Sequence, residues 1–157
     1  MKKMFLFAAV IIAAFTGCSK GDTTPQTDDA TAKIAAVLNG HFVSKIKTLG
    51  NDEIEEVTFK PFASPKEIIS LFETFKAYGT AEISHYYDDH LLETSGSYYY
   101  SIEGAVIDGY ASYVSFYKYS GDYITEGADK REYTPVSATE FKLRDSGSAI
   151  VKTFVKQ

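Results

Sequence analysis

The sequence predicts an all-β domain, an antiparallel up-and-down barrel of about eight strands preceded by one short helix. Apolar and polar residues alternate with period two in nearly every segment after Gly40, as in strands that bury one face. The chain holds 12 Tyr and 11 Phe but no Trp, and Gly, Ser and Thr stand at the breaks. Closure would pair the first and last strands and remove exposed strand edges; a sandwich is the alternative.

The first 17 residues have the order of a bacterial export signal. A basic start precedes an apolar run over residues 4–14, and small residues follow before Cys18. The run is about a dozen residues long and so too short to span a bilayer, which needs roughly 20. We therefore expect residues 1–17 to be removed on export.

Residues 15–18, Phe-Thr-Gly-Cys, resemble a lipoprotein lipobox, with Phe15 at the position of the usual Leu. The resemblance implies that a lipid is attached to the thiol of Cys18 and that the chain is cut before it. Ordinary secretion with a leftover thiol is the alternative. Ser19 after the cysteine resembles the pattern that sorts lipoproteins to the outer membrane. Whether the domain faces the periplasm or the cell surface stays open.

Residues 18–30 read as the lipidated cysteine and a flexible tether, because they are almost entirely polar. Residues 31–157 then form one β domain, a size that one core can support. Loss of Lys2 and Lys3 with the signal changes the formal charge from −5 to −7. The remaining basic residues are scattered singly, which argues against nucleic acid as a partner.

Residues 31–38 predict a short helix, since Ile34, Val37 and Leu38 share one face and Asn39-Gly40 can end it. The strands that follow are expected at 41–48, 55–62, 80–88, 97–107, 113–119, 123–125, 131–135, 139–144 and 149–155. In the strand expected at 55–62, alternation places Val57 and Phe59 on the inner face.

The same alternation turns Phe141 and Leu143 inward near the end of the chain. The exception is the segment 64–77, where Ser64-Pro65-Lys66-Glu67 resembles a capping box with proline at the first helical position. Its apolar residues fit a helical stripe as well as a strand. We expect a helix or an irregular segment through Phe72, with a strand as the alternative.

Four segments resemble lipocalin-like bacterial domains. Residues 38–42 are similar to the Leu-x-Gly-x-Trp opening of that family, with Phe42 at the tryptophan position. Residues 56–61 look like the second strand, 97–102 like the central strand and 133–143 like the penultimate strand pair. The resemblance covers roughly residues 38–155 and implies an up-and-down barrel without identifying a ligand.

Catalytic chemistry has little support in the sequence. With Cys18 lipidated, no thiol remains for a disulfide, a metal site or a nucleophile. Nucleophile elbows, zinc-protease motifs and phosphate loops are absent from the sequence. Two His and two Asp lie within residues 85–90, but strand alternation would separate them, so we expect a strand end and loop rather than a metal site. The chain is therefore expected to be no enzyme and to need no cofactor.

Two functions remain open, and the first is the preferred expectation. A lipid-anchored barrel could hold a small apolar or amphipathic ligand, or a filled barrel could engage another envelope protein. The predicted ligand site combines an inward row near His85, a tyrosine row on the following strand, and residues 68–75 as a lid. Its members are Ile83, His85, Tyr87, Tyr98, Tyr100, Phe72 and Phe75. The tyrosines could equally be structural cross-strand pairs.

Overall fold

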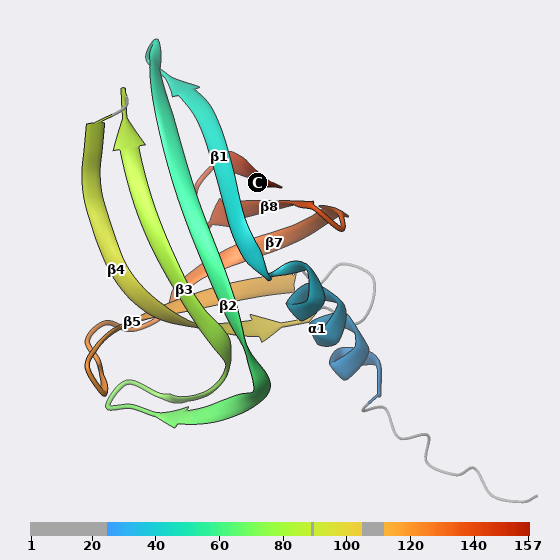
Figure 1. The fold of residues 1–157 in the computed structure, drawn as a ribbon. Coiled ribbons are helices and arrows are strands. Elements are labelled where there is room, and N and C mark those ends of the chain that lie inside the picture. The colour runs from blue at the N-terminus through green and yellow to red at the C-terminus, as the bar shows by residue number, and fades with distance from the viewer. Residues whose placement is uncertain (1–24, 89, 105–111) are drawn as a thin grey trace, which may run out of the picture.

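The computed structural model describes residues 25–88, 90–104 and 112–157 (Figure 1). In this part of the chain one helix, α1 (Pro25–Val37), precedes nine strands of a single antiparallel sheet. The strands are β1 (Gly40–Thr48), β2 (Asn51–Ile69), β3 (Thr74–Tyr87), β4 (His90–Glu103), β5 (Ser112–Ser120), β6 (Tyr123–Ile124), β7 (Asp129–Ser137), β8 (Glu140–Asp145) and β9 (Val151–Lys156). None of the described helical residues form a segment long and apolar enough to cross a bilayer. The expected signal segment and Cys18 lie outside the described residues.

The sheet closes on itself into a barrel. Its strand order is β4-β3-β2-β1-β9-β8-β7-β5-β6, and the order becomes a circle because β4 also pairs with β5. β1 meets β9 where Phe42 pairs with Lys156 and Val43 pairs with Val155. Leaving out the two-residue β6, eight of the described strands make up the barrel in up-and-down order. The predicted fold class and the predicted pairing of the first and last strands are confirmed.

Helix α1 begins at Pro25, six residues before the expected start. Part of the segment expected to be a flexible tether is therefore helical. Proline suits the first helical position because its missing N–H would have no partner there. The helix ends as predicted, since Gly40 adopts a φ of 111°, which favours glycine after a helix.

Phenylalanine rings fill the middle of the barrel. Phe42, Phe59, Phe116 and Phe141, which we call the ring layer, are all at most 1% exposed. The ring centroid of Phe59 on β2 lies 6.1 Å from that of Phe116 on β5 and 6.2 Å from that of Phe141 on β8. Each of these strands is three places from β2 around the barrel. Rings from nearly opposite walls are thus in contact across the interior.

Helix α1 packs against the barrel at the end where β1 begins (Figure 1). Ile34 and Leu38 join the core next to the ring layer, as their shared helical face predicts. The hydroxyl of Tyr100 on β4 reaches the backbone carbonyl of Leu38, with 3.5 Å between the two oxygens. Burial raises the pKa of Tyr100, so this phenol stays neutral inside the barrel.

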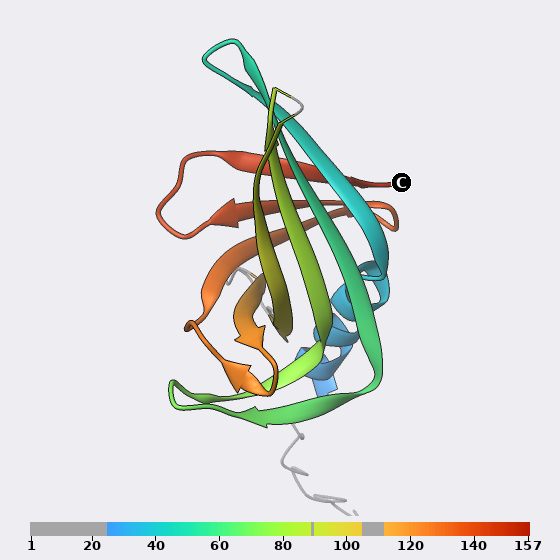
Figure 2. The same ribbon diagram turned by 60° about the vertical axis from the view of Figure 1, so that its left-hand side comes forward.

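The helix favoured for residues 64–77 is wrong, because this segment is a β-hairpin. β2 continues to Ile69 and β3 starts at Thr74, with residues 66–69 paired to residues 74–77. The pairing register shifts between Pro61 and Lys66, and this irregularity accommodates Pro65, which cannot donate to a regular ladder. Beyond it the hairpin curls below β5 and β6 (Figure 2).

The curled part of the hairpin is held by a second apolar cluster. The rings of Phe75 on β3 and Tyr117 on β5 stack with centroids 3.6 Å apart, and Phe62 and Ile68 pack beside them. Tertiary packing against the outer face of β5 therefore overrides the local helix signals of the segment.

The backbone of β3 approaches its neighbours closely at Gly79. A Cβ atom there would lie 2.4 Å from the backbone oxygen of Lys60 and 2.7 Å from both Pro61 Cα and a ring carbon of Tyr100. Backbone atoms cannot move aside as a flexible side chain can. We therefore expect Gly79→Ala to lower the free energy of unfolding by about 1–3 kcal/mol, the usual effect of overpacking.

Urea denaturation followed by circular dichroism measures this change, and Gly127→Ala is the matched control. A Cβ at Gly127 meets nothing within 4 Å. Equal denaturation midpoints for the two variants would contradict the close approach at Gly79.

Candidate functional site

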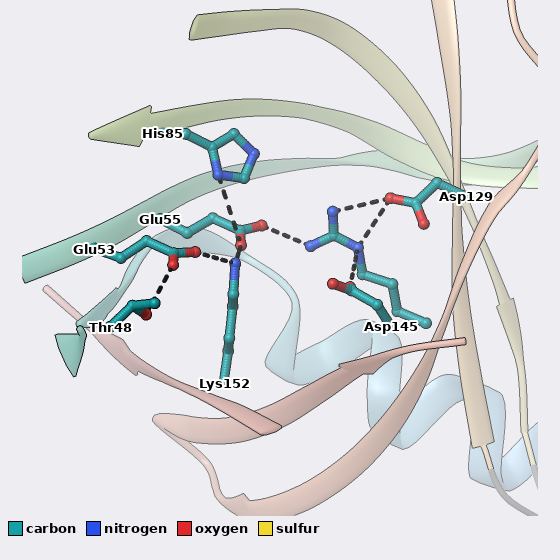
Figure 3. Close-up of polar contacts among 8 residues, drawn as sticks. Thr48, Glu53, Glu55, His85, Asp129, Asp145 and Lys152 are labelled. Carbon is teal, nitrogen blue, oxygen red and sulfur yellow. Dashed lines mark hydrogen bonds and ion pairs between the residues drawn. The ribbon is translucent and has the colours of Figure 1, made fainter. Parts of the chain in front are cut away.

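A buried carboxylate lies inside the barrel on the side of the ring layer away from α1. Glu55 is on the inner face of β2, four residues before Phe59, and its side chain is 1% exposed. Its Oε1 accepts a hydrogen bond from Arg131 Nη1 on β7 at 2.6 Å, and its Oε2 accepts one from Lys152 Nζ on β9 at 2.7 Å (Figure 3). Three strands that are distant in sequence thus meet at one carboxylate.

Further charged groups surround these three side chains. Arg131 also contacts Asp129 at 2.9 Å and Asp145 at 3.1 Å, and Lys152 contacts Glu53 at 2.9 Å. Together with His85, whose Nδ1 is 3.9 Å from Glu55 Oε2, these residues form what we call the ionic cluster. Its members are Glu53, Glu55, His85, Asp129, Arg131, Asp145 and Lys152.

The ionic cluster is held in its charged form. Burial opposes ionisation of Glu55, but the neighbouring Arg131 and Lys152 outweigh this effect and hold the pKa of the carboxyl below its usual value of 4.5. Burial likewise acts against the charge of Arg131 and of Lys152, and Glu55 overcomes it, so both pKa values are raised. Four carboxylates against two cations leave the ionic cluster with a formal charge of −2 when His85 is neutral.

The arrangement fits a structural clamp better than a catalytic centre. Both oxygens of Glu55 bond to the two cations, Arg131 and Lys152, so the central groups are already satisfied. Within the described ranges, no group of three or more His, Cys, Asp or Glu side chains is placed to hold a metal ion. Of the residues weighed as a metal site in the sequence, Asp89 lies outside the described residues.

The structure brings several of the predicted ligand-site residues together. Ala81 pairs with Tyr98 and Gly79 with Tyr100, which places Tyr98 and Tyr100 on the same inner face as Ile83 and His85. Ile83 and Tyr100 are buried in the core. His85 is nearer the end of the barrel, beside Glu55, and its side chain is 29% exposed.

Of the other predicted residues, Tyr87 extends this row beyond His85, opposite Glu53, whereas Phe72 and Phe75 lie apart from it. Tyr87 continues β3 beyond His85 and accepts a hydrogen bond from the side-chain amide of Asn51. Phe75 stacks on Tyr117 in the separate outer cluster. Phe72 is 56% exposed at the tip of the hairpin. Residues 68–75 therefore do not cover the barrel end that carries His85.

Sequence reasoning missed the ionic cluster although a signal was present. Glu55 stands in the same alternating row as Val57 and Phe59, which the sequence predicts to face inward. Arg131 and Lys152 likewise stand two residues before the buried Tyr133 and Phe154. A charged residue in an otherwise inward row indicates a buried ion pair, but its partner depends on barrel closure.

Fold and site define the chain as a closed antiparallel β-barrel protein with a paired ionic cluster at one end. No family model, no curated protein and no solved structure matches this chain. The argument for function therefore rests on the sequence and geometry of the chain itself.

Proposed function

We propose that this chain is a bacterial lipoprotein, anchored in the outer membrane through acylated Cys18, whose filled barrel is a non-enzymatic interaction module of the cell envelope. One observation supports an interaction module over a ligand-binding barrel. The ring of Phe59 contacts the rings of Phe116 and Phe141, which come from nearly opposite walls of the barrel. A barrel of about eight strands can be filled by side chains or can hold one small ligand. Because these rings are in contact across the interior, the ring layer contains no cavity for a ligand.

The ionic cluster supports the same choice. It occupies the barrel on the other side of the ring layer, and its central groups are satisfied by one another. A ligand entering at this end would have to break buried ion pairs, which is costly. The surface left for recognition is the outer face of the barrel and its loops.

Membrane anchoring is tested by replacing the only cysteine of the chain. We expect Cys18→Ala to stop lipidation, because no other thiol can accept the lipid, so the protein should leave the membrane fraction or accumulate with its signal uncut. Fractionation of cells and the mass of the protein measure both outcomes. Unchanged fractionation together with a mass that differs only by the substitution itself would show that Cys18 carries no lipid.

A ligand-binding barrel remains the second candidate, and one observation favours it. The hydroxyls of Ser44 and Tyr133 are buried and have no hydrogen-bond partner among the described residues. Ser44 pairs with Glu55 across β1 and β2, so its hydroxyl belongs to the end of the barrel with the ionic cluster. A small amphipathic molecule bound near His85 could satisfy such groups.

The two candidates predict different contents of the purified protein. Native mass spectrometry of the full chain taken from cells should show the mass of the lipoprotein alone if the barrel is filled. A stoichiometric small molecule that persists through purification would instead support the ligand-binding candidate. Titration with a fluorescent fatty acid checks the same point, since a filled barrel gives no saturable binding.

A further inference from the structure

The tip of the β2–β3 hairpin concentrates exposed apolar side chains. Ile69, Leu71 and Phe72 are 77%, 102% and 56% exposed, and they lie within four consecutive residues. Single exposed apolar residues are common on proteins, whereas a group of large ones on a projecting tip indicates a contact surface.

The tip is ordered by its own hydrogen bonds. Ser70 Oγ donates to the carbonyl of Glu73 at 2.8 Å and accepts from the backbone N–H groups of Phe72 and Glu73 at 3.2 and 3.1 Å. The backbone N–H of Ser70 also donates to Glu73, and Ile69 pairs with Thr74 directly below the turn. Leu71 and Phe72 are therefore held in an outward position.

The base of the hairpin fixes the tip relative to the barrel. The stack of Phe75 on Tyr117 and the packing of Phe62 and Ile68 attach the two strands to the outer face of β5. Lys66 and Lys76 flank the tip together with Glu67 and Glu73, so the tip region has no net formal charge. Apolar contact rather than charge attraction would drive its docking.

The tip lies at the end of the molecule where α1 begins. Figures 1 and 2 both show the first turn of α1 and the β2–β3 tip at the lower end of the barrel, and the β1–β2 tip at the upper end. Six residues lie between Cys18 and Pro25, and the seven steps from one to the other span at most about 25 Å when fully extended. A lipid on Cys18 would therefore keep the membrane close to the end that carries the apolar tip.

We propose that the β2–β3 tip, residues 69–72, docks on the lipid bilayer that holds the N-terminal anchor and forms a second membrane contact. This inference rests on the proposed lipidation of Cys18. Two contacts at one end of the barrel fix its orientation, so that the ionic cluster and the β1–β2 tip point away from the membrane. The apolar side chains of the tip enter the boundary between headgroups and acyl chains, as apolar residues of peripheral proteins do.

The chain offers a matched pair of positions for the test. Leu49 at the β1–β2 tip is 97% exposed, like Leu71, and lies at the opposite end of the barrel. Because Cys18 is the only cysteine and would be acylated, Leu71→Cys or Leu49→Cys provides a single free thiol in the full lipoprotein. Each thiol is labelled with an environment-sensitive fluorophore, and the protein is reconstituted on vesicles of phosphatidylethanolamine and phosphatidylglycerol.

Vesicle sedimentation reports the anchor, and two quenchers report the tip. We expect both labelled proteins to sediment with the vesicles. A spin-labelled lipid should quench the label at position 71 severalfold more than the label at position 49. Iodide in the water should quench the label at 49 more than the label at 71. If both proteins sediment but iodide quenches the two labels equally, the tip does not dock on the bilayer, although the lipid anchor is supported. If neither quencher reaches the label at position 71, the tip is covered by protein rather than by lipid, which also contradicts the proposed docking. If neither protein sediments, the anchor fails and the inference fails with it.

Discussion

Phe59→Ala is expected to lower the free energy of unfolding by about 3–5 kcal/mol, the range for removing a buried aromatic ring. The Phe59 ring is 1% exposed and touches the rings of Phe42, Tyr100, Phe116 and Phe141. The surrounding walls are hydrogen-bonded into a closed barrel and cannot collapse fully into the space left behind. Urea denaturation monitored by circular dichroism measures the loss.

Phe72→Ala is the matched control for this prediction. It removes the same ring from the same hairpin, but Phe72 is 56% exposed, so we expect a change within about 0.5 kcal/mol. If Phe59→Ala costs no more than Phe72→Ala, the ring layer is not packed as described. The cavity made by Phe59→Ala should also bind a small apolar molecule such as benzene, because a space lined by apolar side chains stays dry.

Glu55→Ala is expected to destabilise the barrel by about 3–5 kcal/mol, because it removes the carboxylate shared by the buried Arg131 and the partly buried Lys152. Glu82→Ala is the control. Glu82 pairs with Lys60 at the same 2.7 Å, but both side chains are 59% exposed, and exposed pairs contribute about 0.2–1 kcal/mol. Similar losses in the two variants would contradict the burial of the ionic cluster.

The pH dependence of stability provides a second readout for Glu55. Its pKa is lowered in the folded chain, so its contribution is fully present above the usual value of 4.5 and is lost as the pH falls through the lower folded value. Denaturation midpoints measured below pH 4.5 should therefore fall more steeply for the native chain than for Glu55→Ala. Equal slopes would mean that Glu55 does not titrate as an ion-paired carboxylate.

Much of the interior could be predicted from alternation alone. Val57, Phe59, Phe141 and Leu143 were expected to face inward, and all four are buried. In a closed barrel the two faces of every strand have different surroundings, so a period-two pattern reports directly on burial. This is why the fold class could be predicted from one sequence.

The hairpin at residues 64–77 could not be assigned in the same way. Its Ser64-Pro65 start and dense apolar residues are compatible with a helix. The segment is a strand pair because residues of β2 pair with β3 and Phe75 packs on Tyr117. The ionic cluster was missed for a related reason. Glu55, Arg131 and Lys152 meet because the barrel closes, and no local spacing contains that information.

The contact between opposite walls of the barrel is the central claim, and nuclear Overhauser effects between aromatic side chains measure it most directly. Ring centroids 6.1 and 6.2 Å apart bring the ring protons of Phe59 close to those of Phe116 and Phe141. A filled barrel predicts strong cross-peaks for both pairs, unchanged when a fatty acid is added. Missing cross-peaks, or cross-peaks that disappear as the fatty acid binds, would mean that the barrel opens to hold a ligand and would contradict the account.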